Sequence, residues 1–175
     1  MAAVDPIVFA QLCKLFPALT SKQATNLCFY SMGASHKDIS SLAEATPITI
    51  KKSLESVQKY FNASSLPELK TVFWAGFAFR QVCNKYAIDG ERFLKFYQPD
   101  ALSVLMPVFP ELDKHQLTGA VLHAIGYSAA EIAAKSSFTL MQTNQILSEA
   151  IGGLGAGSGL LLRILITSRF INDLC

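Results

Sequence analysis

Apolar residues recur at helical spacing in the first third of the chain. One run of four lies at intervals of 4, 3 and 4 residues, which places its members on one face of a helix: Ile50, Leu54, Val57 and Phe61. Thr46 followed by Pro47 marks the start of this helix, because the hydroxyl can cap the first turn and the proline ring favours the first helical position. The pattern therefore predicts a helix over residues 46–61 with one buried face.

Polar capping residues predict two shorter helices before it. In a capping box, a side-chain oxygen accepts a bond from a first-turn amide while the residue three positions later reaches back. Two such boxes occur, Thr20 with Gln23 and Ser35 with Asp38. Gly33 supplies the left-handed residue that ends a helix. These signals predict helices over residues 21–32 and 35–44.

A long apolar helix is predicted over residues 66–87. Its start is marked by a third capping-box signal, Ser65 with Glu68. The segment has more apolar residues than one small helical bundle can bury, so a second helical unit of the chain, or another subunit, must cover it. The candidate residues for contact with a dimer or partner are Val72, Phe73, Trp74, Phe77 and Phe79.

The chain repeats itself after 93 residues. Residues 6–73 align with residues 99–166 without a gap, and about one aligned position in five is identical. The identical pairs include Pro6/Pro99, Leu12/Leu105, Phe16/Phe109, Gly33/Gly126, Ser35/Ser128, Thr46/Thr139 and Ser65/Ser158. We therefore predict an all-α tandem repeat of two units, over residues 1–75 and 99–175, joined by a connecting helix or linker over residues 76–98.

Composition excludes disorder but says little about partners. With 175 residues, of which 51% are hydrophobic and 16% charged, the chain can bury a core. The net charge of +2 is too small to indicate nucleic acid, a membrane surface or an acidic partner. The low charged fraction indicates hidden surface, either in an oligomer or between the repeats.

The residues form no recognisable catalytic or metal site. A nucleotide-binding glycine loop, a nucleophile motif and an acid–base pair are all missing from the sequence, so we predict no enzyme activity, no catalytic residue and no cofactor. The cysteines lack paired spacing and the histidines do not complete a zinc set. These residues are Cys13, Cys28, Cys83, Cys175, His36, His115 and His123. We expect free thiols in a reducing compartment.

The chain shows no targeting or membrane signal. Asp5 and Pro6 interrupt the order of a signal peptide. The apolar run over residues 151–166 is interrupted by Arg163 and falls short of the ~20 residues that a spanning helix needs. We therefore expect a cytoplasmic protein without a membrane partner.

Four short blocks of the first copy have the order and spacing of a known module. They are Leu19-Thr20, residues 33–39 (GASHKDI), residues 46–51 (TPITIK) and residues 59–65 (KYFNASS). Over residues 19–73 this layout resembles the four-helix, helix-turn-helix DNA-binding domain of LuxR-type transcriptional regulators. The sequence departs from that family at Lys22 and Gln23, where acidic residues are usual, at Ala43 in place of leucine, and at Ser53, where histidine is frequent.

The resemblance implies that the helix after Thr46 enters the major groove of double-stranded DNA. Lys51, Lys52 and Glu55 would then reach base edges and phosphates. Hydroxyls, helix N-termini and further basic groups would contact the DNA backbone. These residues are Ser35, His36, Lys37, Thr46, Thr49 and Lys59. Modules of this family generally dimerise through the following helix, which here is the segment over residues 66–87.

The second copy lacks the cations of the first. Residues 49–52 read TIKK, whereas the aligned residues 142–145 read QTNQ and offer no positive charge to a phosphate. Glycines within residues 152–157 indicate a shortened or kinked helix. Gln and Asn can read adenine, so a second DNA contact stays open, but we expect this degenerate copy to serve packing or a partner.

The sequence thus predicts a small bacterial-type transcriptional regulator. Its first domain would contact promoter DNA, and its second would serve assembly as a homodimer or as a hetero-oligomer with another regulator. One alternative is a co-regulator or anti-activator whose helix-turn-helix units dock another regulator without touching DNA. Another is a sigma-factor-like protein that docks on RNA polymerase at a promoter.

Overall fold

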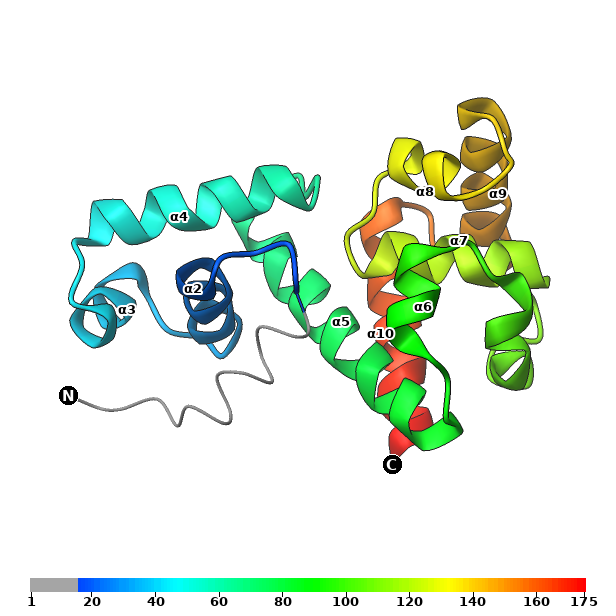
Figure 1. Cartoon of the computed structure of the whole chain (residues 1–175), viewed down its shortest axis with the longest axis horizontal. Coiled ribbons are helices and arrows are strands. Elements are labelled where there is room, and N and C mark those ends of the chain that lie inside the picture. The colour runs from blue at the N-terminus through cyan, green and yellow to red at the C-terminus, as the bar shows by residue number, and fades with distance from the viewer. Residues whose placement is uncertain (1–15) are drawn as a thin grey trace. The chain divides into compact units, whose positions relative to one another are not determined.

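The described part of the chain is built of helices. A computed structural model describes residues 16–175, which contain helices and no strand (Figure 1). In chain order they are α2 (Ser21–Ser31), α3 (His36–Ala43), α4 (Pro47–Tyr60), α5 (Leu66–Tyr86), α6 (Gly90–Lys95), the 3₁₀ helix η1 (Pro99–Leu105), α7 (Lys114–Ala124), α8 (Ala129–Lys135), α9 (Leu140–Gly153) and α10 (Gly159–Leu174). The predicted all-α class and the four helices predicted over residues 21–87 are confirmed.

The chain divides into two compact units. Unit 1 ends at Gly76 and unit 2 begins at Phe77, so the division falls inside α5. The sequence predicts a connecting role for residues 76–98. Of these, residues 77–98 belong to unit 2, where they form the end of α5, helix α6 and the segment that leads into η1.

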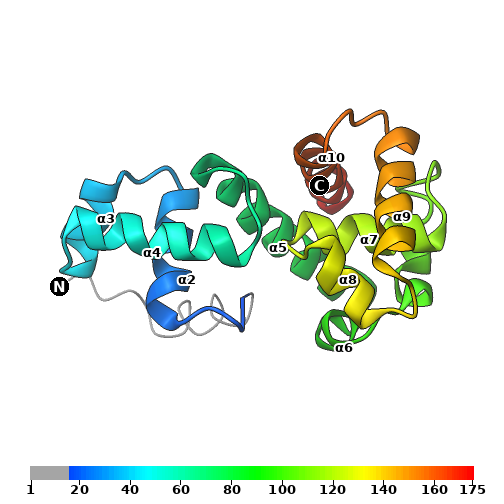
Figure 2. The same ribbon diagram turned by 90° about the horizontal axis from the view of Figure 1, so that it is seen from above.

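Unit 1 is organised around the buried face of α4, which lies across α2 and α3 (Figures 1 and 2). All four residues of the predicted stripe are buried: Ile50, Leu54, Val57 and Phe61. Ile50 and Leu54 pack with Ile39 of α3 in one cluster. In a second cluster, the Phe16 ring lies edge-on to Phe61, with centroids 5.5 Å apart, and stacks on Phe73 at 5.8 Å. The stripe therefore orients α4 and leaves its opposite face outward.

Unit 2 is organised around α7, which packs against η1, α9 and α10. Its aromatic core includes Phe109 and Phe170, whose rings meet edge-on at 5.7 Å. Arg169 of α10 forms a bidentate ion pair with Glu111, with N–O distances of 2.7 and 2.8 Å. Asp173 accepts bonds from Lys85 Nζ and, at 2.8 Å, from the Tyr86 hydroxyl, which ties the end of α10 to the end of α5.

Helix boundaries recur at the spacing of the sequence repeat. The pairs α2/α7 and α4/α9 begin and end 93 residues apart, and α3/α8 and α5/α10 begin 93 residues apart. The predicted caps are formed at the corresponding residues, Thr20 and Asp113, Ser35 and Ser128, and Thr46 and Thr139. Gly33 and Gly126 both take positive φ, 102° and 110°. The parts of the repeat before Phe16, including Pro6, Leu12 and Cys13, lie outside the described residues.

Two local predictions differ from the structure. The Glu68 carboxylate accepts from Ser64 N and Oγ, both at 2.6 Å, and Ser64 is a partner that the sequence did not predict. The predicted shortening of the glycine-rich helix is wrong, since α9 has 14 residues, as α4 has. Its glycines adopt positive φ only after the helix has ended, at Gly155 and Gly157. Across residues 16–175, no helix combines the length and apolarity needed to cross a membrane.

Candidate nucleic-acid interface

Helices α3 and α4 of unit 1 are each held at their start by a short-range cap. Ser35 Oγ accepts from Asp38 N at 3.3 Å, and the Asp38 carboxylate accepts from Ser35 N at 2.8 Å. Bonds from Ser35 hold the pKa of the Asp38 carboxyl below its ordinary value. Thr46 Oγ1 accepts from Thr49 N at 3.2 Å and lies 2.9 Å from Thr49 Oγ1. The hydroxyls predicted to meet phosphate are therefore fixed in place as helix caps.

The outward face of α4 combines three lysines with one exposed apolar side chain. Helical spacing places Ile48, Lys52, Glu55 and Lys59 on one stripe, opposite the buried stripe. Ile48 is 68% exposed, and Lys52 and Lys59 are exposed. Lys51 borders the stripe, and its ammonium lies 3.8 Å from Glu55 Oε1. An exposed pair of this kind is worth little, so Lys51 can exchange its partner for a phosphate at small cost.

His36 is partly withdrawn into the fold. Its ring stacks on Tyr30, with centroids 6.0 Å apart and planes 5° apart, and Nε2 is buried without a hydrogen-bond partner among the described residues. The Lys70 ammonium lies 4.9 Å from the centroid of the same Tyr30 ring. Ser35 and Lys37 beside it are less enclosed, and the Lys37 side chain is exposed. At the start of α3, then, Lys37 is accessible, whereas His36 packs.

The predicted contact residues on α5 are mostly covered within their own units. Val72 and Phe73 lie in the core of unit 1, with Trp74 packed against it. Phe79 is buried in unit 2, with its ring centroid 5.2 Å from that of Phe93. Phe77 is 40% exposed. A partner contact through α5 would therefore fall on Phe77 and the exposed part of Trp74.

Sequence reasoning missed an exposed apolar face on α10. Four of its large apolar side chains are 39–47% exposed: Leu160, Leu161, Ile164 and Ile171. The buried residues Leu162, Ile166 and Phe170 lie on another face of the same helix. A signal was present in the sequence, because residues 159–174 are apolar on more than one helical face.

The outward face of α9 in unit 2 is uncharged over most of its length. Met141, the counterpart of Ile48, is 77% exposed, and Asn144 and Gln145 take the places of Lys51 and Lys52. The single charge of the helix is Glu149, which accepts from Gln145 Nε2 at 2.9 Å and from Gln116 Nε2 at 3.2 Å. This carboxylate is thus engaged by neighbouring amides, and the face offers no cation.

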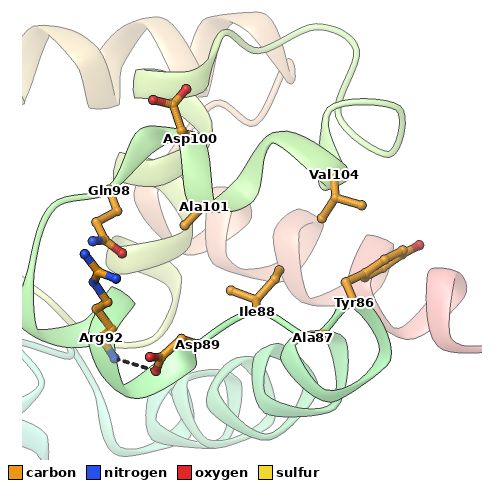
Figure 3. A pocket seen from close by; sticks show the side chains of 9 residues that line it. All are labelled: Tyr86, Ala87, Ile88, Asp89, Arg92, Gln98, Asp100, Ala101 and Val104. Atoms are coloured by element: carbon orange, nitrogen blue, oxygen red, sulfur yellow. Dashed lines mark hydrogen bonds between the residues drawn. The ribbon is translucent and has the colours of Figure 1, made fainter.

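Unit 2 also contains an open hollow of about 340 Å³ (Figure 3). Its walls are Tyr86, Ala87, Ile88, Asp89, Arg92, Gln98, Asp100, Ala101 and Val104, none of them a predicted site residue. Asp89 Oδ1 accepts from Arg92 N at 3.0 Å, Asp100 pairs with Lys114 at 2.6 Å, and the Tyr86 hydroxyl bonds to Asp173. The fold itself therefore uses most of the charged groups around this hollow.

Reactive side chains do not gather elsewhere in the described residues. No group of three or more potential metal ligands comes together within residues 16–175. Cys83 is buried, and burial raises the pKa of its thiol to about 12, which keeps it protonated and unreactive.

Comparison of the chain with models of protein families, with curated protein sequences and with solved structures finds no match. The resemblance to LuxR-type domains therefore rests on the sequence blocks alone.

Proposed function

We propose that the protein is a small DNA-binding transcriptional regulator built from two LuxR-like helix-turn-helix units. Unit 1 contacts double-stranded promoter DNA through α4, and unit 2 serves assembly. The observation that carries the proposal is the outward face of α4, where Lys51, Lys52 and Lys59 surround a single carboxylate opposite a fully buried stripe.

The distribution of charge between the units supports this division of labour. Between Thr20 and Lys70, unit 1 has six lysines and four acidic residues, and three of those lysines lie on α4. Residues 77–175 carry eight Lys or Arg and eight Asp or Glu. Because a lysine that neutralises a phosphate releases a condensed counterion, the α4 face is the better electrostatic match for DNA. The cations exposed for phosphate contact are Lys37, Lys51, Lys52 and Lys59, and the hydroxyls of Ser35, Thr46 and Thr49 lie at the helix starts as further polar groups.

Unit 2 contributes assembly through α10. Leu161, Ile164, Ser168 and Ile171 are exposed and follow one another at intervals of 3, 4 and 3 residues, the spacing of a two-helix seam. This stripe carries no charge, so two copies can face each other without burying an unpaired ion. A homodimer formed in this way presents two α4 helices to two half-sites of an operator.

The experiment that tests DNA binding is a fluorescence-anisotropy titration of a mixed-sequence duplex of about 30 base pairs. Affinity should fall steeply between about 50 and about 200 mM salt, and the variant Lys51→Ala/Lys52→Ala should bind more weakly with a log–log salt slope smaller by up to about 2. The matched control is Asn144→Ala/Gln145→Ala on α9, which should bind as the wild type does. Unchanged binding in the lysine variant would contradict the assignment to α4.

Two surface features of unit 2 favour a second candidate function. The uncharged α9 face and the exposed α10 stripe fit protein partners, as in a co-regulator or anti-activator that docks another regulator. Absence of binding at about 50 mM salt would favour that function. A sigma-like role would instead require that RNA polymerase be retained by the immobilised protein.

A further inference from the structure

Ile48 is the one large apolar side chain on the outward stripe of α4. It is 68% exposed at the second residue of the helix, while Ile50 two positions later is 1% exposed in the core. The cap at Thr46 and the proline at position 47 set the start of α4, so Ile48 does not contribute to the cap or to the buried stripe. Packing within unit 1 therefore gives no reason for an isoleucine there.

The position of Ile48 relative to the lysines indicates what it meets. Ile48, Lys52 and Lys59 lie in the first, second and fourth turns of the helix on the same face. When a recognition helix enters the major groove, its N-terminal residues contact base edges. The apolar group that a base pair presents in that groove is the 5-methyl group of thymine. Isoleucine is β-branched and stiff at χ1, so it loses little side-chain freedom on such a contact.

We propose that Ile48 packs against a 5-methylpyrimidine in the major groove, so that α4 selects sites with a methyl group at this position. The proposal rests on the proposed function, because it needs α4 in the groove. Thymine in an A·T pair and 5-methylcytosine in a G·C pair present the same methyl group. Ile48 is thus a specificity-determining residue, whereas phosphate contacts of Lys51, Lys52 and Lys59 supply affinity for any sequence.

The equivalent position in unit 2 supplies a matched control. Met141 is 77% exposed at the second residue of α9, and Gln145 stands where unit 1 has Lys52. A flexible methionine on a face without cations is not expected to enter the groove. Replacing Met141 removes a similar exposed apolar area without touching the proposed contact.

The test measures affinity of the full chain for pairs of duplexes that differ only in the methyl group. One pair is an alternating A·T duplex and the same duplex with deoxyuridine in place of thymidine. The other is an alternating G·C duplex with cytosine or with 5-methylcytosine. At low salt, each methyl-bearing duplex should bind about fourfold more tightly, the value expected for burying one methyl group. A gain in the A·T pair alone assigns the contact to thymine, and a gain in both assigns it to the methyl group in either base.

The variants decide whether Ile48 makes the contact. In Ile48→Ala the preference for the methyl-bearing duplex should fall to about onefold, while the helical circular-dichroism signal stays unchanged. Met141→Ala should keep the wild-type preference. Binding with no preference in either pair, or a preference that persists in Ile48→Ala, would overturn the inference and leave DNA binding intact. Absence of binding to all four duplexes would overturn the proposed function together with the inference.

Discussion

Helices α4 and α9 share their length, their threonine cap and their buried positions, and they differ on the outward face. Both have 14 residues and begin after a threonine cap. Ile50, Leu54 and Val57 are buried in one, and the corresponding Thr143, Leu147 and Ala150 are buried in the other. Outward, Ile48, Lys52 and Lys59 correspond to Met141, Gln145 and Gly152. Buried positions keep each helix in place, while outward positions diverge at little cost in stability.

The contact between α2 and α4 also differs from the corresponding contact between α7 and α9. In unit 1, Asn26 Nδ2 donates to Ser53 Oγ at 3.0 Å across α2 and α4. In unit 2 the corresponding residues are Gly119 and Ile146, and a Cβ added to Gly119 would lie 3.2 Å from Ile146 Cγ2. A polar contact therefore joins α2 to α4, whereas close apolar packing joins α7 to α9.

The largest effect expected is from truncation of the buried stripe of α4. Leu54 is fully buried in the cluster with Ile39 and Ile50, so Leu54→Ala should lower the free energy of unfolding of unit 1 by about 2–5 kcal/mol. Trp74 is the single tryptophan of the chain and packs against the core of unit 1. Its fluorescence in a urea titration therefore reports the loss of stability of unit 1.

The matched variant in unit 2 is Leu147→Ala. It should lower the urea midpoint of unit 2 as measured by helical circular dichroism. The urea midpoint measured by Trp74 fluorescence should stay in place, because α9 packs against α7 and α8. If Leu147→Ala shifted the Trp74 transition as much as Leu54→Ala does, the two units would not be separate packing units.

A smaller effect is expected from the caps. Thr46→Ala and Thr139→Ala should each lower the free energy of unfolding of their own unit by about 1 kcal/mol, because an N-terminal amide loses its acceptor. Thr139 has the complete box, with Gln142 Oε1 accepting from its backbone N at 2.8 Å. In unit 1 the corresponding position holds Thr49, so Thr49→Gln should complete the box and stabilise unit 1. A loss of stability in Thr49→Gln, measured by Trp74 fluorescence, would contradict this account.

The smallest effect concerns the exposed ion pair between Glu111 and Arg169 in unit 2. Hydrogen bonds from Arg169 hold the pKa of Glu111 at about 2, below its ordinary value of 4.5. Because the folded-state pKa is lowered, the pair stabilises unit 2 above about pH 4.5 and loses that contribution as the pH falls toward 2. In Glu111→Gln the urea midpoint of unit 2 should depend less on pH across this window. An unchanged pH dependence would show that the pair adds nothing to stability.

Sequence patterns predicted the helices and their buried faces well, because local signals determine where each helix begins and which face is apolar. The threonine, serine and aspartate caps, Gly33 and the stripe from Ile50 to Phe61 each act over a few turns at most, and the helices follow them closely. Exposure of a given face depends instead on distant neighbours. Phe79 was predicted to face a partner, yet it packs near Phe93 and Phe170, while the exposed stripe of α10 was overlooked.

The candidate site was only partly predictable for the same reason. The residues on α4 could be assigned to an outward face from helical spacing alone. Withdrawal of the His36 ring depends on Tyr30, six residues earlier and on another helix. Ile48 carried no signal in the sequence, because only its exposure beside Lys52 separates it from the apolar residues that pack.

The comparison between α4 and α9 is tested most directly by NMR of the full chain with ¹⁵N-labelled amides, titrated with duplex DNA at low salt. We expect chemical-shift changes on residues 35–38 and on the first three turns of α4, with none on α9 (Leu140–Gly153) beyond those that dimerisation alone produces. Equal changes on α4 and α9, or changes confined to α9, would contradict the claim that unit 1 is the DNA-contacting unit.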